Sequence, residues 1–259
     1  MKIAEVTRLI EEMAPLGLQE GWDNCGLQVG DANAEATGAL LCLDVTEAIL
    51  DEAIAKGLNL IVTHHPLIFK GLKSITGKNH IERIVMRAIK NDIAIYSAHT
   101  NMDSAWGGVS HLIAKKIGLV DVEVLCPQAE QNAGLGVVGN LPSEEDALSF
   151  LSRVKEIFGV GAVRYAGDAS RAVRRVAICG GAGVEFVNNA ISSGADVYLT
   201  GDVKYHEFQG VTERILIADI GHYESEYFTK EIFNEIITKK IPNFAVHYAE
   251  LEKNPINYL

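Results

Sequence analysis

The stretch Leu58-Asn59-Leu60-Ile61-Val62-Thr63-His64-His65-Pro66 decides the fold class of this chain. It is short, apolar and β-branched, and it lies between Gly57 and Pro66, which predicts a buried strand that ends in two histidines. Adjacent residues on a strand point to opposite faces, so the two imidazoles could serve two different metal ions. Histidine is the commonest protein ligand for metals, and this strand end is therefore the first candidate site.

Similar apolar runs alternate with helical patterns along the chain, which predicts an α/β fold with parallel or mixed sheets. The expected strands are 39–45, 58–64, 93–98, 135–141, 173–179, 196–200, 214–220 and 244–248. The expected helices are 1–17, 47–56, 81–90, 109–117, 144–158, 185–192 and 227–240. We expect Ser143 to cap the helix that follows it, because its hydroxyl can accept a hydrogen bond from the first turn.

The two halves of the sequence resemble each other. Segments 41–65 and 178–202 align without a gap, and each half later places a histidine four residues before an acid, just past a strand. This favours an internal duplication, although any two βα units share part of such a pattern. The polar segment from Cys126 to Ala133 is the expected boundary, giving halves 1–126 and 127–259.

Composition excludes several classes of protein. With 259 residues, 48% of them hydrophobic, the chain can bury a large core, and it has no apolar stretch of the roughly 20 residues that span a membrane. The net charge is −11 and no basic stripe is present, which argues against general nucleic-acid binding but not against a small anion held at a metal. Four separated cysteines and a charged first helix predict a cytoplasmic protein with reduced thiols.

Six possible metal ligands fall at or just beyond predicted strand ends, where α/β proteins commonly place their sites. They are His64, His65, His99, Asp103, His222 and Glu226. This set exceeds the needs of one tetrahedral ion and suits two divalent ions, with Glu226 able to bridge them. Nitrogen and oxygen ligands suit zinc, manganese, iron, cobalt or nickel without choosing among them. His99 could be a ligand or could orient Asp103.

Three other segments have open interpretations. Asp202 and His206 could be an acid/base pair near the metals, could bind substrate, or could belong to an ordinary loop before a helix. The glycine-rich segment 180–183 could meet an anion with its amides, but it lacks a dinucleotide-binding pattern. Segment 22–31 reads as a turn with a buried tryptophan, or as a contact on the rim of the site.

Five ordered motifs resemble those of the Nif-three-like proteins, a family often labelled GTP cyclohydrolase I type 2. They are Trp22-Asp23-Asn24-Cys25-Gly26-Leu27-Gln28-Val29-Gly30, Thr63-His64-His65-Pro66-Leu67-Ile68-Phe69, His99-Thr100-Asn101-Met102-Asp103, Thr200-Gly201-Asp202-Val203-Lys204-Tyr205-His206-Glu207 and Gly221-His222-Tyr223-Glu224-Ser225-Glu226. The resemblance covers nearly the whole chain, which is similar to the short form of the family without its inserted domain.

The resemblance implies two α/β halves with a dinuclear metal site between them, in a ring-shaped hexamer. It carries the family's metal ligands onto His64, His65, Asp103, His222 and Glu226. The function that follows is a metal-dependent hydrolase of a nucleotide-like substrate, nominally GTP, whose ring opening requires water attack at C8 and release of formate. A non-catalytic metal-handling or regulatory protein and a dinuclear phosphoesterase are the alternatives.

Overall fold

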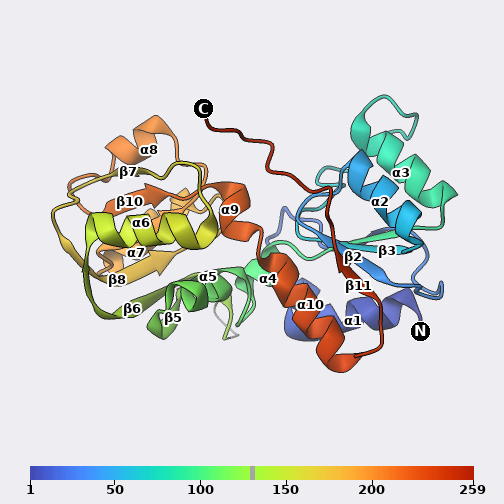
Figure 1. Ribbon diagram of the computed structural model, residues 1–259, viewed down its shortest axis with the longest axis horizontal. Helices are drawn as coiled ribbons and strands as arrows, with labels where there is room; N and C mark the ends of the chain where they lie inside the picture. The colour runs from blue at the N-terminus through green and yellow to red at the C-terminus, as the bar shows by residue number, and fades with distance from the viewer. Residues whose placement is uncertain (129–131) are drawn as a thin grey trace. The chain divides into compact units, whose positions relative to one another are not determined.

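The computed structural model describes residues 1–128 and 132–259, and its chain divides into two compact units. The first unit comprises Met1–Ala105 and Thr229–Lys253, and the second comprises Trp106–Phe228 and Asn254–Leu259. Each unit has one β-sheet with helices packed on it, so the predicted α/β class is confirmed (Figure 1).

The sheet of the first unit has the strand order β1-β4-β3-β2-β11. Its strands are β1 (Gly26–Val29), β2 (Ala39–Cys42), β3 (Leu60–Thr63), β4 (Ala94–Ser97) and β11 (Val246–Tyr248). All are parallel except β1, which runs antiparallel to β4 at the edge. Thr63 is in register with both Cys42 and Ser97, and the carboxyl ends of the three central strands therefore lie level at one edge of the sheet.

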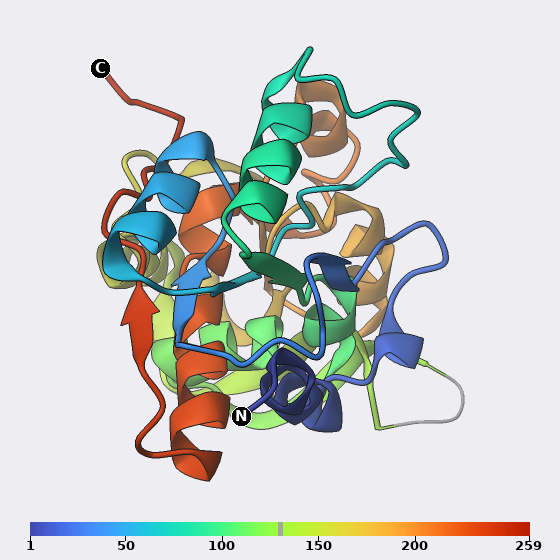
Figure 2. The same ribbon diagram turned by 90° about the vertical axis from the view of Figure 1, so that its right-hand side faces the viewer.

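Helices cover both faces of this first sheet. They are α1 (Ile3–Met13), α2 (Glu47–Lys56), α3 (His80–Lys90), the short α4 (Thr100–Ser104) and α10 (Thr229–Lys240), with a 3-10 turn η1 (Leu16–Leu18). Helices α2 and α3 lie side by side on one face, and α1 and α10 lie on the other (Figures 1 and 2). Thr46 caps α2 by accepting from the Ile49 amide, and Gly57, with φ of 68°, ends it before β3.

The second unit has the strand order β5-β6-β8-β9-β10-β7. Its strands are β5 (Val120–Pro127), β6 (Gly134–Asp146), β7 (Arg164–Ala166), β8 (Ala172–Ile178), β9 (Val197–Thr200) and β10 (Leu216–Asp219). Its helices are α5 (Val109–Ile117), α6 (Ala147–Phe158), α7 (Val187–Ser192) after the 3-10 turn η2 (Val184–Phe186), α8 (Tyr205–Gln209) and α9 (His222–Glu226). Strands β8, β9 and β10 are parallel, and the other neighbouring pairs are antiparallel.

The two sheets repeat one topology. In each, an antiparallel strand borders the last of three parallel strands, so β1-β4-β3-β2 corresponds to β7-β10-β9-β8. Strand β3 then corresponds to β9, and β4 to β10. This repeat supports the internal duplication expected from the sequence.

The predicted strands are all present, and strands β1, β5 and β7 were not among them. Helix α6 starts later than expected because residues 144–146 continue β6, and Asp146 replaces Ser143 as its cap by accepting from the Ser149 amide at 3.0 Å. The expected boundary at 126/127 falls inside β5, whereas the compact units divide after Ala105. Part of the predicted linker, residues 129–131, lies outside the described residues.

Across residues 1–128 and 132–259, no helix has the length and apolar character that crossing a bilayer requires.

Replacing Leu50 by Ala should lower the free energy of unfolding by about 2–5 kcal/mol, because Leu50 is fully buried in the cluster beneath α2. The control is Ile54→Ala on the same helix, where the side chain is 37% exposed, and its effect should stay within about 1 kcal/mol. Urea unfolding followed by circular dichroism measures both. Equal losses in the two variants would contradict the assignment of the buried face.

Candidate metal centre

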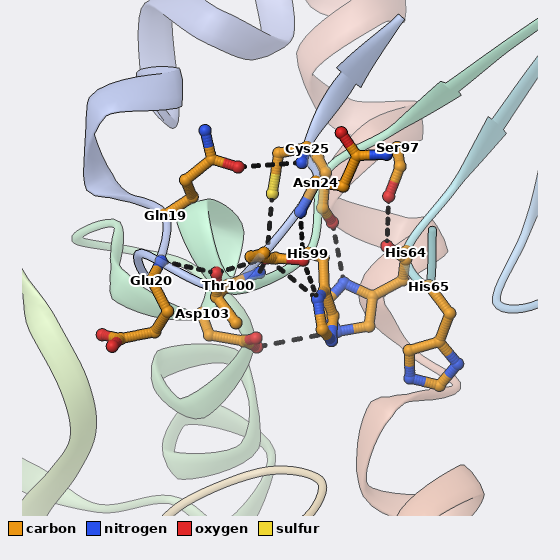
Figure 3. A network of polar contacts seen from close by, with 12 residues as sticks. Gln19, Glu20, Asn24, Cys25, His64, His65, Ser97, His99, Thr100 and Asp103 are labelled. Carbon is orange, nitrogen blue, oxygen red and sulfur yellow. Dashed lines mark hydrogen bonds and ion pairs between the residues drawn. The ribbon is translucent and has the colours of Figure 1, made fainter. Parts of the chain in front are cut away.

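Three histidines of the first unit converge at the carboxyl edge of its sheet (Figure 3). His64 and His65 follow β3, and His99 follows β4. One possible ligand atom from each ring lies within 4.8 Å of the other two, so the group could hold a metal ion. His64 is fully buried, and the other two are half-buried.

Two of the rings are oriented by oxygen atoms of residues just beyond neighbouring strands. His64 Nδ1 lies 2.8 Å from the carbonyl oxygen of Ala98, and His65 Nδ1 lies 2.8 Å from Asp44 Oδ1. In the neutral tautomer that these contacts favour, Nδ1–H donates and Nε2 carries the lone pair that binds metal. Strand β3 ends at Thr63, so the alternation of faces expected for the pair does not apply, and their ring centroids lie 5.1 Å apart.

His99 is oriented by a carboxylate from the segment before β1. Its Nδ1 lies 2.9 and 3.0 Å from the two oxygens of Asp23, which also accepts from the Thr100 amide and hydroxyl and from Cys25 Sγ. Burial raises the pKa of Asp23, but the hydrogen bonds from His99, Thr100 and Cys25 outweigh burial and hold its pKa well below the usual range. Asp23 therefore stays ionised opposite the ring.

Burial raises the pKa of the Cys25 thiol to about 12, and Cys25 is therefore a neutral donor here rather than a thiolate ligand.

Asp103 lies on α4, with one carboxylate oxygen 3.7 Å from His64 Nε2. His99 stands four residues before Asp103, a spacing that would put both side chains on one face of a helix if both were helical. Helix α4 begins only at Thr100, and His99 precedes it with a non-helical backbone. The imidazole of His99 thus turns to Asp23, while Asp103 adds an oxygen donor beside His64.

The second unit carries a smaller ligand pair on α9, where the spacing of four residues puts both side chains on one face of the helix. His222 Nε2 lies 3.0 Å from Glu226 Oε2, and His222 Nδ1 lies 2.8 Å from Asp202 Oδ2. The side chain of Glu226 is only 4% exposed. A carboxylate this buried requires compensating positive charge, from a protonated histidine or from a cation shared with it.

The glycine-rich segment after β8 lies against this pair and does not form an anion cradle. The amides of Gly180, Gly181 and Gly183 donate to hydroxyl groups, of Ser110, Ser225 and Thr200 respectively. A Cβ at Gly181, where φ is 63°, would lie 2.1 Å from Glu226 Oε1. Glycine is therefore required there for the backbone to approach the buried carboxylate.

The two residues suggested for acid/base work differ in their placement. Asp202 follows β9 in the left-handed region, with φ of 56°, and its carboxylate contacts His222. His206 is exposed on α8, and its Nδ1 lies 3.3 Å from Gln209 Oε1. Asp202 is thus placed to orient His222, as Asp23 orients His99.

The donor set fits a divalent metal. Imidazoles held through Nδ1 by a carbonyl or a carboxylate are the usual form of metal-binding histidines, and nitrogen and oxygen donors suit a borderline divalent ion. Sequence reasoning missed the orienting residues Asp44 and Asp23. Asp44 could have been found by the strand-end argument, since it lies two residues beyond β2.

Comparison with known sequences places this chain in a family. A sequence model of Duf34/NIF3 (NGG1p interacting factor 3) matches residues 1–255. The chain belongs to the Duf34/NIF3 family. This confirms the resemblance drawn from the five sequence motifs.

Relatives in this family match over the full length of the chain. A Clostridium perfringens protein named GTP cyclohydrolase 1 type 2 homolog is 40% identical over 262 residues, which cover all of both chains. The crystal structure of Staphylococcus aureus protein SA1388 matches with a TM-score of 0.92 and 30% identity, covering 100% of this chain and 99% of that one. A Bacillus cereus protein related to NIF3 matches with a TM-score of 0.91 and 28% identity, with the same coverage.

Replacing Asp23 by Asn should weaken zinc binding about 10- to 100-fold, because the ring of His99 loses the carboxylate that orients it. Competition against a chromophoric chelator measures the affinity. Cys25→Ala is the matched control, since it removes one donor to Asp23 and keeps the contact of Asp23 with His99. Wild-type affinity in the Asn variant would exclude His99 from the ligand set.

Proposed function

We propose that this protein is a metal-dependent hydrolase that acts on a nucleotide-like substrate. One observation carries the proposal, the convergence of three histidines within 4.8 Å. Protein contacts occupy Nδ1 on each ring, so each can present Nε2 to an ion.

We further propose a dinuclear centre with His64, His65, Asp103, His222 and Glu226 as ligands and Glu226 as the bridge. The pair on α9 supports this, because one imidazole and one carboxylate are too few donors for a tetrahedral site. The first unit offers a surplus of donors if His99 also binds. Five or six protein ligands over two ions leave positions for water and substrate, which is typical of catalytic sites.

A bound divalent ion would lower the pKa of water to about 7 and polarise an electrophile. The chain's own residues would set the orientation of the ligands. Asp23 and Asp44 hold the rings of His99 and His65, and Asp202 holds His222. Asp202 or His206 is our candidate for moving a proton, and the contact of Asp202 with His222 favours a positioning role for Asp202.

The names of the relatives support a nucleotide substrate. The Clostridium perfringens protein is named GTP cyclohydrolase 1 type 2 homolog. Hydrolytic opening of the guanine imidazole ring adds water at C8 and releases that carbon as formate. Hexameric assembly, which the family resemblance implies, and a cytoplasmic location belong to the same proposal.

Glu226→Ala should lower the metal content by at least one equivalent per chain, and His64→Ala should do the same. Elemental analysis after reconstitution with zinc, manganese or iron measures the content. Glu213→Ala, an exposed acid of the second unit, is the control and should keep the wild-type value. If Glu226→Ala and His64→Ala each lost one ion and the double variant lost both, the two ions would occupy separate centres rather than one shared centre. Less than about one equivalent in the wild type would exclude a dinuclear centre.

The reaction is tested by incubating the metal-loaded protein with GTP and with a phosphodiester panel. Release of formate in proportion to loss of GTP is the expected result. Phosphate or a nucleoside monophosphate without formate would identify a phosphoesterase. Full metal content with no turnover on any nucleotide would favour a metal-handling or regulatory protein.

A further inference from the structure

Two exposed aromatic rings lie beside the histidine cluster. Trp22 is 59% exposed and Phe69 is 44% exposed, so the sequence-based expectation of a buried tryptophan is wrong. Their ring centroids lie 5.6 Å apart, with the planes at 55°. Both contact the ring of His99, at centroid distances of 6.1 Å from Trp22 and 6.4 Å from Phe69. One ring of the candidate metal centre thus joins directly to an exposed aromatic pair.

Hydrogen bonds fix the two segments that carry these rings. Asn24 Nδ2 donates to the Ile68 carbonyl at 2.6 Å, and the Ile68 amide donates to Gln28 Oε1 at 3.0 Å. Gln28 Nε2 in turn donates to the Asn24 carbonyl at 2.7 Å. These hydrogen bonds link the two segments that carry the aromatic pair, and they hold both rings beside His99 at the surface.

Positive charge follows immediately after Phe69. Residues 66–79 contain three exposed lysines, Lys70, Lys73 and Lys78, and no carboxylate. Its positive charge contrasts with the chain as a whole, whose net charge is −11. The first unit therefore contains an aromatic pair at the surface, a segment with three lysines and a cluster of three histidines.

We propose that Trp22 and Phe69 form a stacking surface for the base of a nucleotide, with Lys70 and Lys73 toward its phosphates. This proposal rests on the proposed function, and it specifies a nucleotide rather than a sugar phosphate as the substrate. Flat aromatic faces stack on any nucleobase, whereas a sugar phosphate offers nothing planar to them. Contiguous apolar patches on a surface, unlike single exposed residues, mark interaction sites. The adjoining lysines favour an anionic small molecule over a second protein copy as the occupant.

The test uses Trp22 as its own reporter. The chain has two tryptophans, so Trp106→Phe leaves Trp22 as the single one. In the metal-loaded protein, GMP should quench its fluorescence saturably, and ribose 5-phosphate should bind weakly without quenching. Phe69→Ala in this background should weaken GMP binding about 5- to 100-fold. The matched control is Ile75→Ala, in the same segment and 48% exposed, which should leave GMP binding unchanged.

Two further measurements separate the possible failures. Metal content and size-exclusion profile are compared between the parent and Phe69→Ala proteins, and both should be unchanged. Equal binding of GMP and ribose 5-phosphate, or no effect of Phe69→Ala, would overturn the stacking surface while leaving the metal centre intact. A change of oligomeric state would overturn it in favour of a contact between copies. Quenching by GMP without hydrolysis of any nucleotide would uphold the surface and refute the hydrolase.

Discussion

The parallel register of β2, β3 and β4 is the constraint on which the histidine cluster depends. Thr63 lies opposite both Cys42 and Ser97, so the chain leaves all three strands at one level. Residues just beyond the strands then meet although they are distant in sequence. Asp44 follows β2, the two histidines follow β3, and His99 follows β4. A shift of one residue in either pairing would move the residues that follow one strand out of level with those that follow its neighbour.

The oxygen atoms around the rings decide what the cluster can bind. An imidazole has two neutral tautomers, and the partner of Nδ1 selects the one that leaves Nε2 as the donor to a metal. Asp23 shows how firmly this choice is made, because its hydrogen bonds to His99, Thr100 and Cys25 overcome the effect of burial and lower its pKa. The resulting negative charge also favours a cation at the cluster. Ligand geometry and charge balance thus come from the same contacts.

The sequence predicts structure that depends on neighbouring residues, and it does not predict contacts between residues that are distant along the chain. Apolar runs predicted β3 and β4, with Gly57 and Pro66 flanking the first of them, and therefore predicted the positions of His64 and His99, because strand ends are local features. Asp23 precedes β1, and its contact with His99 depends on how β1 pairs with β4, which no local pattern encodes. The exposure of Trp22 was missed for a related reason. Hydrophobicity predicts burial, whereas the hydrogen bonds between Asn24, Gln28 and Ile68 keep this ring at the surface.

The repeated topology also explains why the two units supply different ligands. In the alignment of the halves, Gly201 stands where His64 stands after β3. A Cβ at Gly201 would lie 2.8 Å from the His222 amide nitrogen and 2.9 Å from the Gly181 carbonyl oxygen. The backbone entering α9 therefore fills the space that a ligand after β9 would need. A ligand side chain at position 201 is therefore excluded, and the ligand pair of the second unit lies on α9. The asymmetry of the ligand sets is thus a steric consequence of how each β-strand end is packed.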